Sequence, residues 1–133
     1  MRVLQFAFGS EAPDDLHKPH NYIQHCVVYT GTHDNDTALG WFRTLTPEER
    51  QRALRYLHST GRAVHWDMIR AVLASVADTA IVPLQDVLGL GTTARMNLPG
   101  TNQHNWRWRL QPRQLNARLS KRLRTLTHTY GRL

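Results

Sequence analysis

The chain has 133 residues, of which 41% are hydrophobic and 20% charged, with eight glycines, six prolines and one cysteine. This is the composition of a globular protein, and it excludes collagen-like, disulfide-scaffold and wholly disordered classes. The single cysteine, Cys26, cannot form an internal disulfide, and no apolar run reaches the roughly 20 residues that a membrane-spanning helix needs. The sequence therefore predicts a soluble, cytoplasmic protein that does not associate with membranes.

The net charge of +7 is distributed unevenly along the chain. Residues 1–86 contain all ten acids and eight Lys or Arg, whereas residues 87–133 contain nine Lys or Arg and no acid. A basic segment of this kind suggests nucleic-acid binding. The alternative, a solvated helix face that balances acidic surface elsewhere, is favoured here because charge reports on solubility and partners more than on fold.

Three apolar segments are expected to form strands. They are Val3–Phe8, Cys26–Thr30, and the stretch from Ala80 through Leu88, which Pro83 interrupts. Each is followed by a glycine, and none alternates between apolar and polar residues. Strands of nearly continuous apolar character are typically buried on both faces, so the pattern favours a parallel sheet.

Three helices follow from capping signals and apolar periodicity. The first begins at Thr46, which is followed by a proline at the first helical position and a capping-box glutamate, and it extends to about Ser59. The second spans Trp66–Ala77 and the third Gln114–Tyr130, each with one apolar face. The positions expected to be buried are Ala53, Leu54, Leu57, Trp66, Ile69, Val72, Leu73, Val76, Leu115, Leu119, Leu123 and Leu126.

The order of these elements, with two helices between the second and third strands, indicates α/β architecture with right-handed crossovers. Three parallel strands form a poor domain by themselves, because both outer strands have open hydrogen-bonding edges and apolar faces that need cover. We therefore expect the chain to be part of a larger sheet or barrel, and to aggregate or form oligomers in isolation.

The densest polar cluster is Thr30–Thr37, directly after the second expected strand. In parallel α/β folds, catalytic groups gather in loops at the carboxyl ends of strands, and Gly31 lets the chain turn so that His33 and Asp34 project into a cleft. The carboxylate is an acceptor and the imidazole a donor for polar substrate groups. The alternative, which the pattern weighs equally, is an Asp-rich turn that caps a following helix.

Two further clusters are less specific. The segment His17–Tyr22 with His25 and Cys26 contains zinc-ligand residue types, but the spacing does not recur, so a polar substrate-facing loop is favoured and no metal is expected. The segment Gly89–Thr101 lacks the glycine spacing of phosphate-binding loops. The Trp-Arg pairs within Asn105–Arg109 suit base stacking, a sugar platform or the cover of apolar surface.

Several motifs, taken together, closely resemble the C-terminal part of a 4-alpha-glucanotransferase of the amylomaltase (disproportionating enzyme) family. The most specific are Thr-His-Asp-Asn and Arg-Met-Asn. The matching stretches are Met1–Phe8, Pro19–Tyr22, Val28–Thr37, Leu39–Trp41, Pro83–Gly91 and Ala94–Arg109. The resemblance implies a (β/α)₈ barrel to which residues 1–133 contribute the last three strands with their helices, without a separate second domain.

Members of this family retain the anomeric configuration through a covalent glycosyl-enzyme intermediate, and they transfer a segment of a 1,4-alpha-D-glucan to a sugar hydroxyl. The resemblance implies that Asp34 is a catalytic carboxylate holding hydroxyls of the reacting sugar, that His33 is its companion donor and that Asn97 contacts the sugar. The implied partners are maltooligosaccharides or other alpha-1,4-glucans. No cofactor, metal or nucleic acid is implied.

The family's nucleophilic aspartate and acid/base glutamate precede the matching region, and Glu11, Asp14 and Asp15 match neither motif. We therefore expect the chain to be a fragment of such an enzyme, and the isolated 133 residues to be inactive. Two alternatives stay open, a non-catalytic glucan-binding module and, with less support, a basic nucleic-acid-binding protein.

Overall fold

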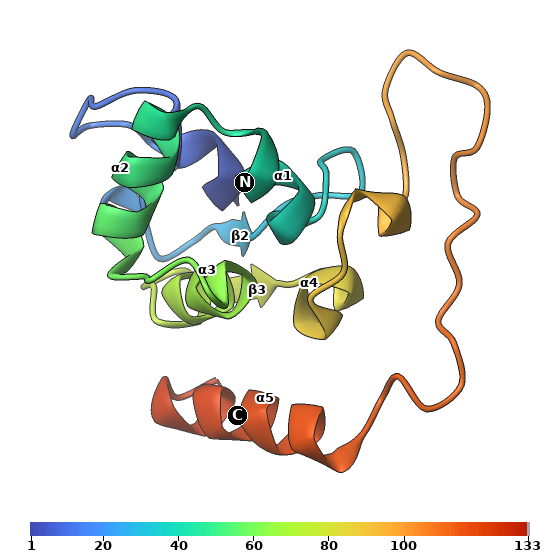
Figure 1. Ribbon diagram of the computed structural model, residues 1–133. Coiled ribbons are helices and arrows are strands. Elements are labelled where there is room, and N and C mark those ends of the chain that lie inside the picture. The colour runs from blue at the N-terminus through green and yellow to red at the C-terminus, as the bar shows by residue number, and fades with distance from the viewer. Residues whose placement is uncertain (133) are drawn as a thin grey trace.

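The computed structural model describes residues 1–132, which fold around one small parallel sheet (Figure 1). In chain order the elements are β1 (Arg2–Val3), η1 (Leu4–Phe8), η2 (Pro19–Asn21), β2 (Val27–Tyr29), α1 (Ala38–Thr44), α2 (Pro47–Leu57), α3 (Val64–Leu73), β3 (Thr79–Ile81), α4 (Leu84–Leu88), η3 (Thr92–Ala94) and α5 (Ala117–Thr129), where η denotes a 3₁₀ helix. The strand order is β1-β2-β3, with Val28 paired to Arg2 on one side and Ala80 on the other. The predicted α/β class and parallel sheet are confirmed.

Within residues 1–132, one face of the sheet is covered and the other is left partly exposed. Val28 is fully buried in the main hydrophobic cluster, which also contains residues of η1, α1, α2 and α3. Because strand side chains alternate between faces, Tyr29 lies on the opposite face, where Ile81 is 43% exposed. The expectation of strands buried on both faces is therefore wrong for this chain taken by itself.

The first predicted helix forms with the expected cap. In α2 the Thr46 hydroxyl accepts from the Glu49 backbone N–H at 3.2 Å, and the Glu49 carboxylate accepts from the Thr46 N–H at 3.0 Å. The helix buries Ala53 and Leu57, while Leu54 is half-buried. It ends before the predicted Ser59.

The second and third predicted helices are shorter than expected. The second, α3, buries Trp66, Ile69, Val72 and Leu73 and ends at Leu73, so that Val76 lies beyond it and is 64% exposed. The third, α5, begins after Leu115, which is therefore exposed. The remaining leucines of its apolar stripe pack on a second cluster built around Trp66; they are Leu119, Leu123 and Leu126.

Two predicted strand segments are helical instead. Of Val3–Phe8 only Val3 is in a strand, because the chain turns into η1 and buries Leu4, Ala7 and Phe8 at helical rather than alternating spacing. The stretch after Ala80 leaves β3 at Ile81, and α4 begins directly after Pro83. A short apolar run does not distinguish a strand from a buried helical turn, and a proline suits the start of a helix better than a strand interior.

An additional helix, α1, follows the polar cluster. Its N-cap is Thr37, whose hydroxyl accepts from the Gly40 N–H at 3.1 Å. The alternative interpretation is confirmed in that a helix follows the cluster, but its expectation that an aspartate caps this helix is wrong, because the cap is Thr37.

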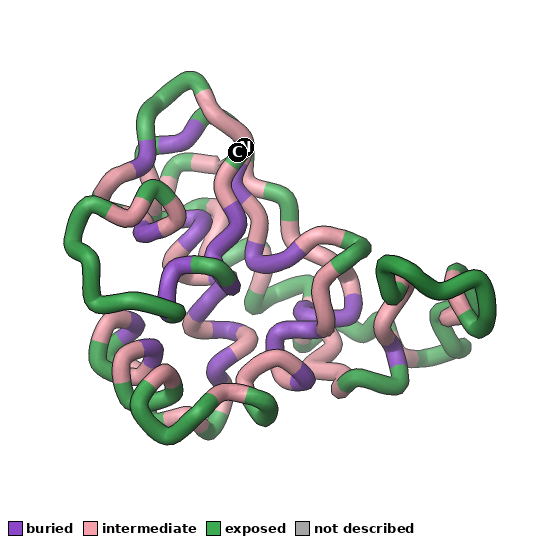
Figure 2. Tube along the Cα trace, turned by 90° about the horizontal axis from the view of Figure 1, so that it is seen from above, coloured by how far each residue is buried: buried purple, intermediate pink, exposed green. Residues whose placement is uncertain are grey.

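A long segment without helix or strand joins η3 to α5 and passes along one side of the molecule (orange in Figure 1). Figure 2 shows that most of this segment is exposed, in contrast to the buried residues at the centre of the molecule. Its start, Ala94–Asn97, folds back towards the carboxyl end of β2, where Asn97 N–H donates to the His33 carbonyl at 3.1 Å. A helix with the length and hydropathy of a membrane span does not occur within residues 1–132.

Candidate functional site

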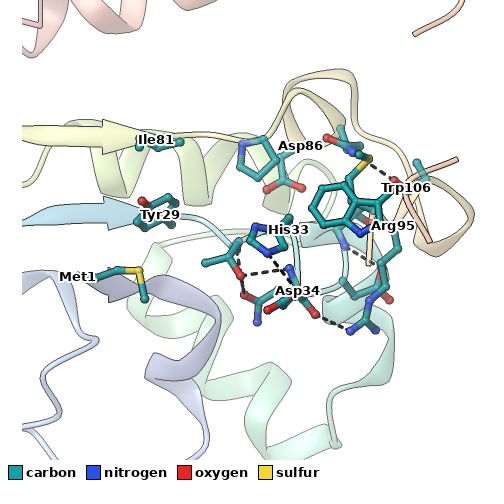
Figure 3. A pocket seen from close by; sticks show the side chains of 17 residues that line it. Met1, Tyr29, His33, Asp34, Ile81, Asp86, Arg95 and Trp106 are labelled. Carbon is teal, nitrogen blue, oxygen red and sulfur yellow. Dashed lines mark hydrogen bonds and ion pairs between the residues drawn. The ribbon is translucent and has the colours of Figure 1, made fainter. Parts of the chain in front are cut away.

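A cleft of about 480 Å³ opens where β2 and β3 end. Met1, Tyr29 and Ile81 lie along the strands, and a polar group that includes His33 and Asp34 gathers beyond the strand ends (Figure 3). The predicted polar cluster therefore lies at the carboxyl ends of parallel strands, which is where α/β folds place their ligand sites.

The loop after β2 is shaped by short polar contacts. The Asn35 side-chain oxygen accepts from both the backbone N–H and the hydroxyl of Thr32, at 2.9 and 2.8 Å. A Cβ on Gly31 would lie 2.4 Å from the amide nitrogen of Gln5, and that nitrogen donates to the Asp36 carbonyl at 2.8 Å. A Cβ at Gly31 would therefore displace the Gln5 amide, and the glycine leaves room for Gln5 of η1 to donate to the loop.

The three predicted site residues meet at the edge of the cleft, which His33 and Asp34 line and Asn97 does not. The carboxylate of Asp34 accepts from the side-chain amide of Asn97 at 2.7 Å, and the same oxygen is 3.3 Å from Nε2 of His33. Both Asp34 and His33 side chains are about half exposed, at 49% and 57%. The structure thus brings the three side chains together, with Asp34 and His33 accessible from the cleft.

A second segment holds the main chain of this loop. The guanidinium of Arg95 donates to the Asp34 carbonyl at 2.6 Å and to the Asn97 carbonyl at 2.8 Å. Trp106, with a left-handed backbone conformation at φ +61°, places its ring 5.1 Å from that of His33. Of the two tryptophans in the predicted Trp-Arg cluster, only Trp106 lines the cleft.

Two further aspartates of the cleft each accept hydrogen bonds from two protein groups, one on each oxygen. Asp36 accepts from the Thr37 N–H and from the Thr92 hydroxyl, both at 2.7 Å. Asp86 is 1% exposed, and it accepts from the Thr30 hydroxyl at 2.6 Å and from the Ala38 N–H at 2.7 Å. Burial raises the pKa of Asp86, the two hydrogen bonds oppose that shift, and the nearby charge of Asp36 adds to it.

Arg95 and Asp86 were not singled out from the residue pattern. Arg95 lies 61 positions from Asp34, so its role depends on a contact that local periodicity does not reveal. Asp86 is part of a short apolar stretch that was assigned to a strand. A charged residue inside such a stretch is the signal that could have identified it, because a carboxylate is buried only where hydrogen bonds compensate it.

The histidine-rich segment does not form a site of its own. Nδ1 of His17 accepts from the Val3 N–H at 3.0 Å, His20 bonds the Tyr56 hydroxyl at 2.8 Å, and His25 pairs with Asp78 at 2.8 Å. Among residues 1–132, no three His, Cys, Asp or Glu side chains are grouped so as to hold a metal ion. None of residues 17–26 lines the cleft, so the expectation of a substrate-facing loop there is wrong for this cleft.

The chemistry of the cleft suits a neutral ligand rich in hydroxyl groups. Asp34 supplies a carboxylate acceptor, His33 a ring nitrogen, and Trp106 an apolar ring at the edge of the polar group. Asp34 is the one carboxylate of the cleft, within residues 1–132, that is not enclosed by two protein donors on separate oxygens. The cleft can therefore bind and orient such a ligand, but it lacks a second free carboxylate to act with Asp34.

The chain is similar in sequence and in structure to known proteins of one family. A family model described as 4-alpha-glucanotransferase matches residues 1–116. The chain is 50% identical over 137 residues to the chloroplast and amyloplast 4-alpha-glucanotransferase of Arabidopsis thaliana, covering 100% of this chain and 24% of that protein. The chain is 49% identical to the 4-alpha-glucanotransferase of Synechocystis, covering 99% of this chain and 26% of that protein. It is 48% identical to that of Thermus thermophilus, covering 100% of this chain and 28% of that protein.

A solved structure, the amylomaltase from Streptococcus agalactiae in complex with acarbose, superposes with a TM-score of 0.95 at 32% sequence identity. The superposition covers 98% of this chain and 27% of that chain. This chain thus spans about a quarter of the length of the curated relatives that it matches. It belongs to the 4-alpha-glucanotransferase family.

Proposed function

We propose that residues 1–133 form the C-terminal segment of a 4-alpha-glucanotransferase barrel and supply Asp34 to its catalytic centre. The observation that carries this is the group of Asp34, His33 and Asn97 at the carboxyl ends of parallel strands, in a chain of this family. The uncovered face of the sheet supports a place in a closed (β/α)₈ barrel, because such a face needs strands or side chains opposite it.

In this proposal Asp34 stabilises the transition state rather than forming the covalent bond. Retaining transfer needs a nucleophilic carboxylate and a carboxylic acid about 5–5.5 Å apart. Asp36 and Asp86 are each held by two donors, so neither is available to act with Asp34 as such a pair. Asp34 would instead accept hydrogen bonds from ring hydroxyls, and these bonds strengthen as the sugar distorts towards the oxocarbenium-like state.

His33 and Asn97 would determine how Asp34 presents its carboxylate. Asn97 donates to one carboxylate oxygen of Asp34, and in this proposal the other oxygen accepts from the sugar. His33 lies 3.3 Å from the oxygen that Asn97 bonds, and its ring is 5.1 Å from the tilted ring of Trp106, so both rings line the cleft where a sugar would lie. The substrates would be maltooligosaccharides or other alpha-1,4-glucans, and the Streptococcus agalactiae relative is a structure with acarbose bound.

Several basic residues of 87–133 make contacts within the protein, which supports a structural role for them rather than nucleic-acid binding. Arg122 stacks on the ring of Trp66 at 4.1 Å, and Arg109 donates to two backbone carbonyls of its own segment. Arg132 donates to carbonyls at the end of α3, while Arg95 supports the Asp34 loop. Several of the arginines that suggested a nucleic acid are therefore engaged by the protein itself.

The test uses a hybrid enzyme in which this chain replaces the matched quarter of the Synechocystis relative. We expect the hybrid to disproportionate maltotriose, and Asp34→Asn to lower kcat by at least about 100-fold, since such hydrogen bonds contribute several kcal/mol in the transition state. Asp14→Asn, the same chemical change at an exposed loop position, is the control and should leave kcat unchanged.

Two results would contradict the proposal. One is full activity of the Asp34→Asn hybrid, and the other is transfer by the isolated 133-residue chain. If the isolated chain binds maltooligosaccharide while Asp34→Asn leaves the hybrid active, the non-catalytic glucan-binding module is the better description.

A further inference from the structure

Asp86 joins the two ends of the loop that carries Asp34. One carboxylate oxygen accepts from the hydroxyl of Thr30, the residue that precedes the loop, and the other accepts from the N–H of Ala38, the residue that follows it. Thr30 and Ala38 are both fully buried, as is Asp86 at 1% exposure. The loop between them, residues 31–37, is more exposed and includes His33 and Asp34.

Burying the Asp86 carboxylate costs hydration free energy, so packing alone does not explain its position. A carboxylate taken out of water loses several kcal/mol of hydration unless hydrogen bonds replace it, and a hydrophobic residue of similar size would avoid the cost. Burial raises the pKa of Asp86, its two hydrogen bonds lower it, and the nearby charge of Asp36 raises it further. What the carboxylate provides, and an apolar side chain does not, is a pair of acceptors that bind β2 and α1 at a fixed separation.

We propose that Asp86 is a positioning residue for the transfer reaction, which sets the conformation of residues 31–37 and through it the direction of the Asp34 carboxylate. This inference rests on the proposed function of Asp34. Asp86 itself does not contact substrate in this arrangement, because both of its oxygens are engaged by the protein. Its effect on the reaction would pass entirely through Asp34.

The hydrogen-bonding pattern, rather than the charge, is what the loop requires. In Asp86→Asn the side-chain oxygen can still accept from the Ala38 N–H, and the new amide can donate to the Thr30 hydroxyl, which also accepts hydrogen bonds. Asp86→Ala removes both links. Thr30→Val removes one link and leaves the Asp86 carboxylate in place.

The hybrid enzyme is the system for the test, with kcat and KM measured for maltotriose and hydrogen exchange followed in the peptide that contains residues 31–37. For Asp86→Ala we expect kcat to fall by about 10- to 100-fold with little change in KM, because a displacement near 1 Å can cost that much. Exchange in the loop should accelerate. The kcat of Thr30→Val should lie between those of Asp86→Ala and the parent, and the kcat of Asp86→Asn should stay within a few-fold of the parent value.

A double-mutant cycle separates positioning from general damage. If Asp86 acts through Asp34, adding Asp86→Ala to Asp34→Asn lowers kcat no further, because the group that it positions is already lost. A purely structural role would lower kcat again. Asp67→Ala is the control: it also removes a carboxylate bonded to a hydroxyl, that of Ser59 at 2.6 Å, and should lower the melting temperature without altering kcat.

The outcomes are distinct for the two proposals. If Asp34→Asn abolishes activity and Asp86→Ala keeps the parent kcat, or if their effects on kcat multiply, the inference is wrong and the proposed function stands. If Asp34→Asn keeps the parent kcat, the proposed function is wrong. Should Asp86→Ala fail to fold, Thr30→Val decides: an unchanged kcat overturns the inference, and a loss that disappears in the Asp34→Asn background supports it.

Discussion

The side-chain amide of Asn97 donates a 2.7 Å hydrogen bond to the carboxylate of Asp34, although the two residues are 63 positions apart in the chain. The Asn97 backbone N–H also donates to the His33 carbonyl at 3.1 Å. A single residue therefore fixes both the main chain and the carboxylate of the β2 loop. The segment after η3 is part of the site and does not merely connect it to α5.

Replacing Asn97 tests how much of the Asp34 orientation depends on that bond. In the hybrid enzyme, Asn97→Ala leaves the Asp34 carboxylate without its amide donor, and we expect kcat/KM for maltotriose to fall by about 10- to 100-fold, the cost of one hydrogen bond to a charged group. Asn102→Ala, an exposed position in the same segment, is the matched control. Equal kcat/KM in the two variants would show that the bond does not orient Asp34.

Matched substitutions at Gly31 and Gly9 test whether Gln5 supports the loop after β2. A Cβ at Gly31 would collide with the Gln5 amide at 2.4 Å, whereas nothing lies within 4 Å of the corresponding position at Gly9. We expect Gly31→Ala to lower the free energy of unfolding by about 1–3 kcal/mol, as overpacking does, and Gly9→Ala to have little effect. Denaturant unfolding of the hybrid measures both, and equal effects would contradict the contact.

The fold could be anticipated where local signals agree with packing. The capping box at Thr46 and the apolar face of α3 both form, because each depends on residues within one or two turns. The segment Val3–Phe8 is predicted as a strand but forms mainly a 3₁₀ helix, because an apolar run of six residues is compatible with either. Contacts with distant helices decide between them. The sequence pattern predicts that Pro83 interrupts a strand, whereas in the structure it precedes the first turn of α4.

The site could be anticipated in part for a similar reason. His33 and Asp34 follow β2 directly, so their place at the sheet edge follows from strand order alone. The partners that orient them do not follow in this way, because Arg95, Asn97 and Asp86 reach the loop only after the chain has formed three helices and a third strand. Of these three residues, only Asn97 is predicted from the sequence as a site residue, and that prediction comes from the family resemblance.

Arg132 is expected to hold α5 against the domain. Its guanidinium donates to the carbonyls of Leu73, Ser75 and Ala77, which follow or end α3 and lack helical partners. Since hydrogen bonds to charged groups contribute about 1.5–3 kcal/mol, Arg132→Ala should lower stability by about 2–3 kcal/mol and accelerate hydrogen exchange throughout α5. Arg124→Ala removes an exposed arginine of α5 and is the control. Unchanged exchange in α5 would show that its leucines suffice.

His65 should make the stability of the domain depend on pH. Burial lowers the pKa of its ring below the ordinary value, the charge of Arg122 lowers it further, and Asp67 opposes both. Its Nδ1 is buried without a hydrogen-bond partner among residues 1–132. Because the unfolded state then binds more protons than the folded state, this contribution to stability is present above about pH 6.5 and is lost as the pH falls through the folded-state pKa.

Arg122→Met tests the electrostatic part of that effect. Methionine keeps an apolar contact with Trp66, on which the guanidinium now stacks at 4.1 Å, but removes the positive charge near His65. We expect the pKa of His65 to rise, so that less stability is lost between about pH 7 and pH 5. Histidine-selective ¹³C NMR of the hybrid follows the ring directly, with Arg124→Met as the control for charge on the exposed side of α5. The same His65 pKa in both variants would assign the shift to burial alone.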